Sequence, residues 1–154
     1  FLSFFLSFFL SFFLSFFLSA VLCLGLPDAS CGGTVIGGRG YITSPGYPNG
    51  YAHNLDCVYL VAIPNEKVEV LFMDFDTETH YDYVAVYGGK YMNEEGLKTP
   101  GWSGSLLPTD SWKNENYIWL HFKTNANNDA DPGFHKGWKA LYRKYWPYME
   151  VEKK

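Results

Sequence analysis

Four carboxylates within nine residues are the strongest candidates for chemistry in this sequence: Asp74, Asp76, Glu78 and Asp82. A second oxygen-rich segment later in the chain contains Asn125, Asn127, Asn128, Asp129 and Asp131. Calcium takes about six to eight oxygen ligands, which such segments can supply, and clustered carboxylates repel one another without a cation. Solvated loop acids explain the same pattern. A calcium site and a solvated acidic surface therefore both remain open.

Motifs for catalysis are missing. No His-Glu-x-x-His zinc motif occurs, and segment 101–105 lacks the Gly-x-Ser-x-Gly spacing of a nucleophile elbow. The four histidines stand apart from one another, and the glycine-rich segment 37–40 lacks the spacing of a nucleotide-binding loop. Because neither a catalytic triad nor a metal-protease motif can be assembled, we expect no enzyme activity.

Length and composition limit the number of domains and exclude two further classes of protein. A chain of 154 residues allows one domain with appendages. Its formal net charge of −4 argues against nucleic acid as a partner, because phosphate backbones are bound by concentrated basic faces. Aromatic residues make up 19% of the chain, which is too many for a disordered protein and indicates a folded body.

The first 27 residues carry no charge and open with four copies of Phe-Leu-Ser-Phe. A tandem TTTC tract read in triplets encodes this repeat, so residues 1–19 are interpreted as translated simple-sequence DNA. An uncharged 26-residue helix would be about 39 Å long, enough to cross a bilayer, and small residues at Ala29 and Ser30 suit signal cleavage. We expect residues 1–30 to be a signal peptide or a membrane anchor, with an extracellular body and membrane contact only if this leader is retained.

Short alternating stretches separated by turn signals follow residue 30. Alternation is clearest at Ile118, Leu120 and Phe122, with Trp119 and His121 on the opposite face. Similar stretches lie at 68–72, 84–86 and 138–142, and none shows helical periodicity. This pattern predicts an all-β, antiparallel sandwich or barrel.

Three cysteines remain to be assigned. Cys23 lies in the apolar leader and would leave with a cleaved signal. Cys31 and Cys57 can then form a disulfide, which would contribute about 3.5 kcal/mol by the chain-entropy estimate. Two free buried thiols are the alternative, although a secreted domain favours the bond.

Several motifs of the body occur in one order. They are Cys31-Gly32-Gly33, Gly40-Tyr41-Ile42-Thr43-Ser44-Pro45-Gly46-Tyr47-Pro48-Asn49-Gly50-Tyr51, Cys57-x-Tyr59-x-Val61-x-Ile63-Pro64, Val70-x-Phe72-x-x-Phe75-x-x-Glu78, Tyr81-Asp82-Tyr83-Val84-x-Val86-Tyr87 and Gly137-Trp138-Lys139-Ala140-Leu141-Tyr142. This set resembles a CUB domain over residues 31 to about 143, with a polar tail at 144–154. The resemblance implies an antiparallel jelly-roll β-sandwich in an extracellular protein.

The resemblance also implies a calcium site and shows two departures. Many CUB domains bind calcium through residues that match Glu78, Asp82 and Asn125 here; the third is usually an aspartate, whose charge Asp129 could replace. The family's second disulfide is absent: its first cysteine is missing before Tyr81, and Ser103-Gly104 stands where its partner would be. We therefore expect one edge of the sandwich to be less restrained.

Aromatic residues supply a second candidate surface. Alternation places Tyr83, Ala85 and Tyr87 on one strand face, and exposed aromatics suit protein or glycan contacts, whereas cover by loops is an equally acceptable interpretation. The first functional hypothesis is a secreted, non-catalytic module that binds an extracellular protein or glycan with calcium in its loops. The alternatives are the recognition-domain fragment of a larger extracellular protease of the astacin type, and a membrane-tethered CUB protein.

Overall fold

The computed structural model describes residues 31–126 and 134–147. The predicted leader, the acid-rich residues Asp129 and Asp131, and the end of the tail lie outside these ranges. Within them, no helix is both long and apolar enough to cross a membrane.

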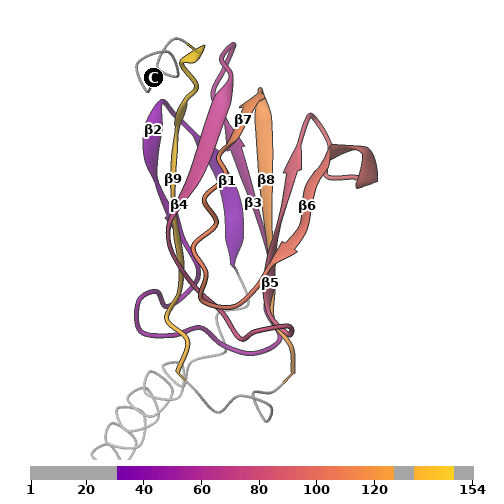
Figure 1. Cartoon of the computed structure of the whole chain (residues 1–154). Helices are drawn as coiled ribbons and strands as arrows, with labels where there is room; N and C mark the ends of the chain where they lie inside the picture. Colours follow the sequence, from indigo (N-terminus) through magenta and orange to yellow (C-terminus); the bar gives the residue numbers. More distant parts are fainter. Residues whose placement is uncertain (1–30, 127–133, 148–154) are drawn as a thin grey trace, which may run out of the picture.

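Two β-sheets pack face to face (Figure 1). The five-stranded sheet has the order β1-β3-β8-β5-β6, and the four-stranded sheet the order β2-β9-β4-β7. The strands are β1 (Gly32–Ile36), β2 (Arg39–Thr43), β3 (Asp56–Ala62), β4 (Val68–Asp76), β5 (Tyr83–Gly88), β6 (Leu97–Trp102), β7 (Trp112–Glu115), β8 (Tyr117–Lys123) and β9 (Gly137–Lys144), with one 3₁₀ turn, η1 (Glu94–Gly96). The expected all-β sandwich is confirmed. Its pairing is antiparallel except between β1 and β3, which run parallel.

The core lies between the sheets and follows the alternation of the sequence. Ile118, Leu120 and Phe122 on β8 are buried, as are the inward residues of β4 and β9. Trp138 on β9 is fully buried at the centre. Its ring meets those of Tyr59, Phe72 and Phe122 edge to face at 5.4, 5.7 and 5.9 Å. These contacts bind the two sheets through β3, β4, β8 and β9, because T-shaped aromatic pairs contribute beyond their buried area.

Cys31 and Cys57 are joined in a disulfide, as expected, with their Cα atoms 5.0 Å apart. The bond fastens the residue before β1 to the fully buried Cys57 on β3. It thereby holds β1, which pairs only with β3 among the described strands, against the edge of the five-stranded sheet.

A candidate cation site among three loops

Three connections meet at one end of the sandwich: β2–β3, β4–β5 and the segment that follows β8 (Figure 1). Glu78 and Asp82 belong to the β4–β5 connection and are both fully buried. Asn125 follows β8, and Tyr51 reaches the same place from the β2–β3 loop. The structure therefore brings together three of the predicted ligands, Glu78, Asp82 and Asn125.

Hydrogen bonds hold the two carboxylates in place. The Tyr51 hydroxyl donates to Asp82 Oδ2 at 2.6 Å and accepts from the Glu78 backbone N–H at 2.9 Å. The Asn125 backbone N–H donates to Asp82 Oδ1 at 2.8 Å, and its side-chain Nδ2 donates to Glu78 Oε2 at 3.1 Å. Both oxygens of Asp82 and one of Glu78 are thus already fixed by the protein.

Two oxygens in this cluster are buried without a hydrogen-bond partner among the described residues: Glu78 Oε1 and Asn125 Oδ1. They belong to the two side chains that touch each other through Nδ2 and Oε2. A buried carboxylate oxygen without a partner is costly, and most buried polar atoms in proteins are satisfied. Both atoms are of the kind that calcium prefers, so the residues present fit a hard cation.

Tyr51 is a part of this site that the sequence did not single out. Burial raises the pKa of its hydroxyl, and the hydrogen bond to Asp82 raises it further. The hydroxyl therefore stays protonated near neutral pH and keeps donating to Asp82. Its only sequence signal was its place at the end of the Gly50-Tyr51 turn motif.

The β2–β3 loop that carries Tyr51 is fastened to the end of β8. Thr124 Oγ1 accepts from the Leu55 N–H at 2.8 Å and donates to the Ala52 carbonyl at 3.1 Å. The Asn54 N–H donates to the Asn125 carbonyl at 2.7 Å. Because Asn125 is bonded on both its backbone and its side chain, the loop end of β8 is tied to the other two connections.

The remaining acids of the cluster do not join the site. Asp74 accepts from the Tyr47 hydroxyl at 2.8 Å and pairs with Lys136 Nζ at 2.7 Å. Asp76 contacts His135 Nδ1 at 3.1 Å and accepts from the Lys136 backbone N–H at 3.1 Å. Burial acts to raise the pKa of Asp74, but the bonds from Lys136 and Tyr47 outweigh it, so the net shift is downward. The run of four carboxylates is thus divided between Asp74 and Asp76, which bond to Lys136 and His135, and the buried pair Glu78 and Asp82.

The short turn between Glu78 and Asp82 is held by the segment that stands where the family's second disulfide would end. Ser103 Oγ accepts from the His80 N–H at 2.8 Å and donates to the Glu78 carbonyl at 3.0 Å. The Gly104 N–H donates to Thr77 Oγ1 at 3.1 Å, and the Thr77 N–H donates to the Gly104 carbonyl at 3.0 Å. Four hydrogen bonds therefore join the two segments that a disulfide would otherwise link.

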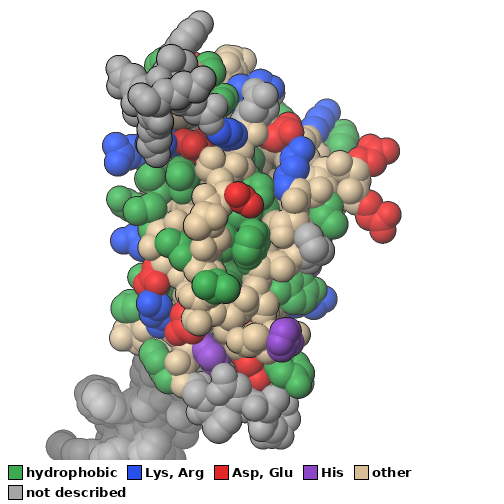
Figure 2. All heavy atoms as spheres, in the orientation of Figure 1, with side chains coloured by type: hydrophobic (Ala, Val, Ile, Leu, Met, Phe, Trp, Pro, Cys, Tyr) green, Lys and Arg blue, Asp and Glu red, His purple; other side chains and the backbone are tan. Residues whose placement is uncertain are grey.

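The surface at this end of the sandwich carries acidic and histidine side chains (Figure 2). Within the described ranges, no group of three or more His, Cys, Asp or Glu side chains could hold a metal by itself. The candidate site instead combines two carboxylates with one amide, and Asp129 lies in the segment outside the description.

The predicted aromatic surface is only partly open. Tyr83, Tyr87 and Trp119 are half-buried on the outer face of the five-stranded sheet, where Trp119 Nε1 donates to the Gly89 carbonyl at 3.1 Å. Trp112 belongs to the core, and Ala85 on the outer face is buried as well. Open aromatic rings lie on loops, at Tyr81 and Tyr91, and on strands, at Tyr41 of β2 and Tyr117 of β8.

His121 and Lys123 both contact Asp56 on the same outer face. Its Nε2 lies 2.6 Å from Asp56 Oδ1, and Lys123 Nζ lies 3.3 Å from Asp56 Oδ2. The hydrogen bond with His121, more than that with Lys123, lowers the pKa of Asp56.

Comparison with known proteins identifies the family. The family model described as CUB domain matches residues 31–142. Rat cubilin is 32% identical over 117 residues, which are 72% of this chain and 3% of that protein. Bone morphogenetic protein 1 of Xenopus laevis is 29% identical over 118 residues, covering 73% and 16%.

Solved structures agree. The MASP-1 CUB2 domain bound to Ca²⁺ matches with a TM-score of 0.60 and 27% identity, covering 74% of this chain and 99% of that one. The chain spans a small fraction of the curated relatives but nearly the whole of this single solved domain. The match runs from the first disulfide cysteine to Tyr142, the last buried residue of β9, and the chain belongs to the CUB domain family.

Proposed function

We propose that this chain is a non-catalytic, extracellular module that binds another protein, with one Ca²⁺ ordering its loop end. Glu78, Asp82 and Asn125 would hold the ion, helped by Asp129. The metal would act as a structural charge that the three loops share. No reaction step is assigned to it.

The observation that carries this proposal is the pair of unsatisfied buried oxygens, Glu78 Oε1 and Asn125 Oδ1. A cation between them would compensate two fully buried carboxylates that have no lysine or arginine partner among the described side chains. The structure of the MASP-1 CUB2 domain bound to Ca²⁺ supports the choice of calcium. Nearly the whole of that domain, 99%, is covered by the match to this chain.

An extracellular location is supported by the disulfide between Cys31 and Cys57, since such bonds persist in oxidising compartments. Binding is preferred to catalysis because the site is built from acids and amides fixed by hydrogen bonds. We expect the partner to present a basic side chain to this acidic loop end, which favours a protein over a neutral glycan.

A second candidate function is suggested by how little of its relatives this chain matches. The match covers 3% of rat cubilin and 16% of the Xenopus laevis protein. The chain would then act as one recognition module within a larger extracellular protein, of which an astacin-type protease is one example. Sequencing the 5′ end of the transcript separates the two: an upstream catalytic exon supports the larger protein, and a short signal supports the single module.

Thermal unfolding tests the calcium proposal. A ligand at a hundredfold excess over its dissociation constant stabilises the folded state by about 2.7 kcal/mol, which raises the melting temperature by roughly 10 °C. We expect millimolar calcium to produce such a rise and a chelator to reverse it. Asp82→Asn should remove the calcium-induced rise, whereas Asp110→Asn, at an exposed loop residue, should keep it. A rise that survives in Asp82→Asn would contradict the assigned site.

A further inference from the structure

Strand β1 forms one edge of the five-stranded sheet. It pairs with β3 in an unbroken parallel register from Gly32 to Ile36, and no described strand pairs with its other side. Four of its five residues are exposed, and Ile36 has 69% of its surface open to solvent. Among the described residues, the backbone groups on that side have no strand partner.

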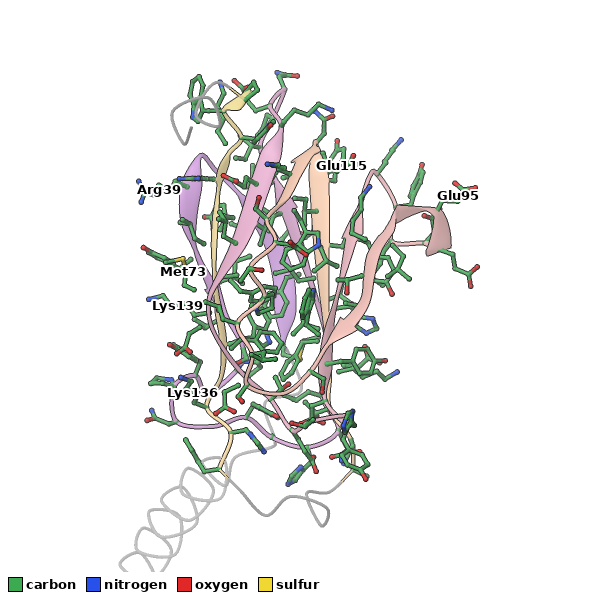
Figure 3. The ribbon with its side chains drawn as sticks, in the orientation of Figure 1. Arg39, Met73, Glu95, Glu115, Lys136 and Lys139 are labelled. Carbon is green, nitrogen blue, oxygen red and sulfur yellow. A yellow bond between two sulfur atoms is a disulfide. The ribbon has the colours of Figure 1, made fainter. Side chains whose placement is uncertain are left out.

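The other three edges carry features that discourage such pairing. Charged side chains, proline, bulges and short length all protect sheet edges. β2 begins with Arg39, which points away from the sandwich (Figure 3). β6 contains Lys98 and Pro100, and its pairing with β5 shifts register twice. β7 has four residues and includes Lys113 and Glu115.

β1 has none of these features. Its sequence, Gly-Gly-Thr-Val-Ile, contains no charge and no proline, and its register with β3 has no bulge. Among the described edge strands, β1 is the one without the features that protect the edges at β2, β6 and β7. An edge of this kind is a template for a further strand.

The sequence of β1 also fits its own copy. In an antiparallel pair centred on Thr34, Thr34 lies opposite Thr34 of the second copy. Ile36 of each copy then lies opposite Gly32 of the other, and Val35 lies opposite Gly33. A side chain added at Gly33 would meet no atom within 4 Å in the single chain, whereas one added at Gly32 would clash with the Val58 carbonyl oxygen, so the open space lies beside Gly33, opposite Val35. Large residues therefore face glycines, and no like charges meet across the twofold axis.

We propose that β1 pairs antiparallel with β1 of a second copy of this chain. The two five-stranded sheets then form one ten-stranded sheet, and their outer faces become continuous. Ile36 lies in register with Ala62, and Ala62 with Tyr117, so an uncharged row extends from the new interface across each sheet. The pairing uses none of the proposed calcium ligands and is independent of the proposed function.

The expected dimer is weak. Five paired residues make an interface smaller than the standard size of stable complexes, so we expect a dissociation constant on the order of 10 µM. Main-chain hydrogen bonds supply the affinity, and the match of Val35 to the open space at Gly33 selects the register.

Analytical ultracentrifugation of the full-length gene product, collected from the medium of a secreting cell, tests the association. We expect a monomer–dimer equilibrium between 1 and about 200 µM. Thr34→Lys places two like charges opposite each other and should raise the dissociation constant at least tenfold. The matched variant Thr43→Lys, also an exposed threonine on an edge strand, should leave it unchanged. A protein that stays monomeric over this range, or a dimer indifferent to Thr34→Lys, overturns the proposal.

Cysteine cross-linking tests the register. Directly opposed residues have Cβ atoms about 5 Å apart, so Thr34→Cys should form a disulfide-linked dimer under mild oxidation. Ile36→Cys should not, because the two copies of residue 36 would lie about 13 Å apart along the strands. Linkage of both variants, or linkage of Ile36→Cys alone, contradicts the register, and linkage of neither contradicts the pairing.

Discussion

Replacing Asn125 with aspartate separates the protein's own hydrogen bonding from cation binding at the loop site. In the structure, Asn125 Nδ2 donates to Glu78 Oε2 at 3.1 Å. Asn125→Asp turns this donor into a third carboxylate and turns an attraction into a repulsion. The same change supplies calcium with a charged ligand in place of a neutral one.

The expected cost without calcium follows from these contacts. A hydrogen bond to a charged group contributes about 1.5–3 kcal/mol, and two like charges about 4 Å apart repel by about 4 kcal/mol at an effective dielectric constant of 20. Side-chain rearrangement relieves part of this repulsion, so we expect the free energy of unfolding to fall by about 3–5 kcal/mol in the presence of a chelator. With calcium present, the added charge should lower the calcium dissociation constant at least tenfold, or about 1.4 kcal/mol.

Urea unfolding with and without calcium measures both effects. Asn125→Asp should be much less stable than the native sequence in chelator, and its gain from calcium should be larger. Asn49→Asp, an exposed residue of the β2–β3 loop, is the matched control and should change neither value by more than about 0.5 kcal/mol. Equal stability of Asn125→Asp and the native chain in chelator, or an equal gain from calcium, would show that Asn125 neither bonds to Glu78 nor contributes to calcium binding.

Three further outcomes are expected. Peptide mapping without reduction should recover Cys31 and Cys57 in one linked pair, and replacing both should lower stability by about 2–4 kcal/mol; two alkylatable thiols would be the contrary result. N-terminal sequencing of secreted material should begin near residue 31, as for a cleaved signal, whereas an intact chain in the membrane pellet would indicate an anchor. Asp74 has a lowered pKa in the folded state, so its stabilisation is present above the unfolded pKa of about 3.9 and is lost as the pH falls through the folded value. Asp74→Asn should therefore cost up to about 1 kcal/mol at pH 7 and almost nothing at pH 2, and an equal cost at both pH values in urea unfolding would contradict this.

The interior strands were predictable because their pattern is set by burial. β4, β8 and β9 contribute inward residues to the shared core, so their alternation is visible in the sequence. β6 and β7 were not predicted as strands. β6 contains Lys98 and Pro100, and its course depends on irregular pairing with β5. The parallel pairing of β1 with β3 was also missed, because strand direction is decided by tertiary contacts.

In the candidate site too, some residues could be predicted from the sequence and others could not. Glu78 and Asp82 could be predicted because each belongs to a short family motif, one ending at Glu78 and the next beginning at Tyr81. Tyr51 could not, because its bonds to them cross 27 and 31 residues of sequence. Nearness along the chain was also a poor guide to Asp74, which pairs with Lys136 from a distant part of the chain.

Calorimetric titration of calcium into the chelator-treated, secreted protein is the direct test of the cation site. We expect saturable binding of one ion per chain, and loss of that binding in Glu78→Gln while Asp110→Asn retains it. Absence of binding at millimolar calcium, or one-to-one binding that Glu78→Gln leaves unchanged, would contradict a cation site built from Glu78, Asp82 and Asn125.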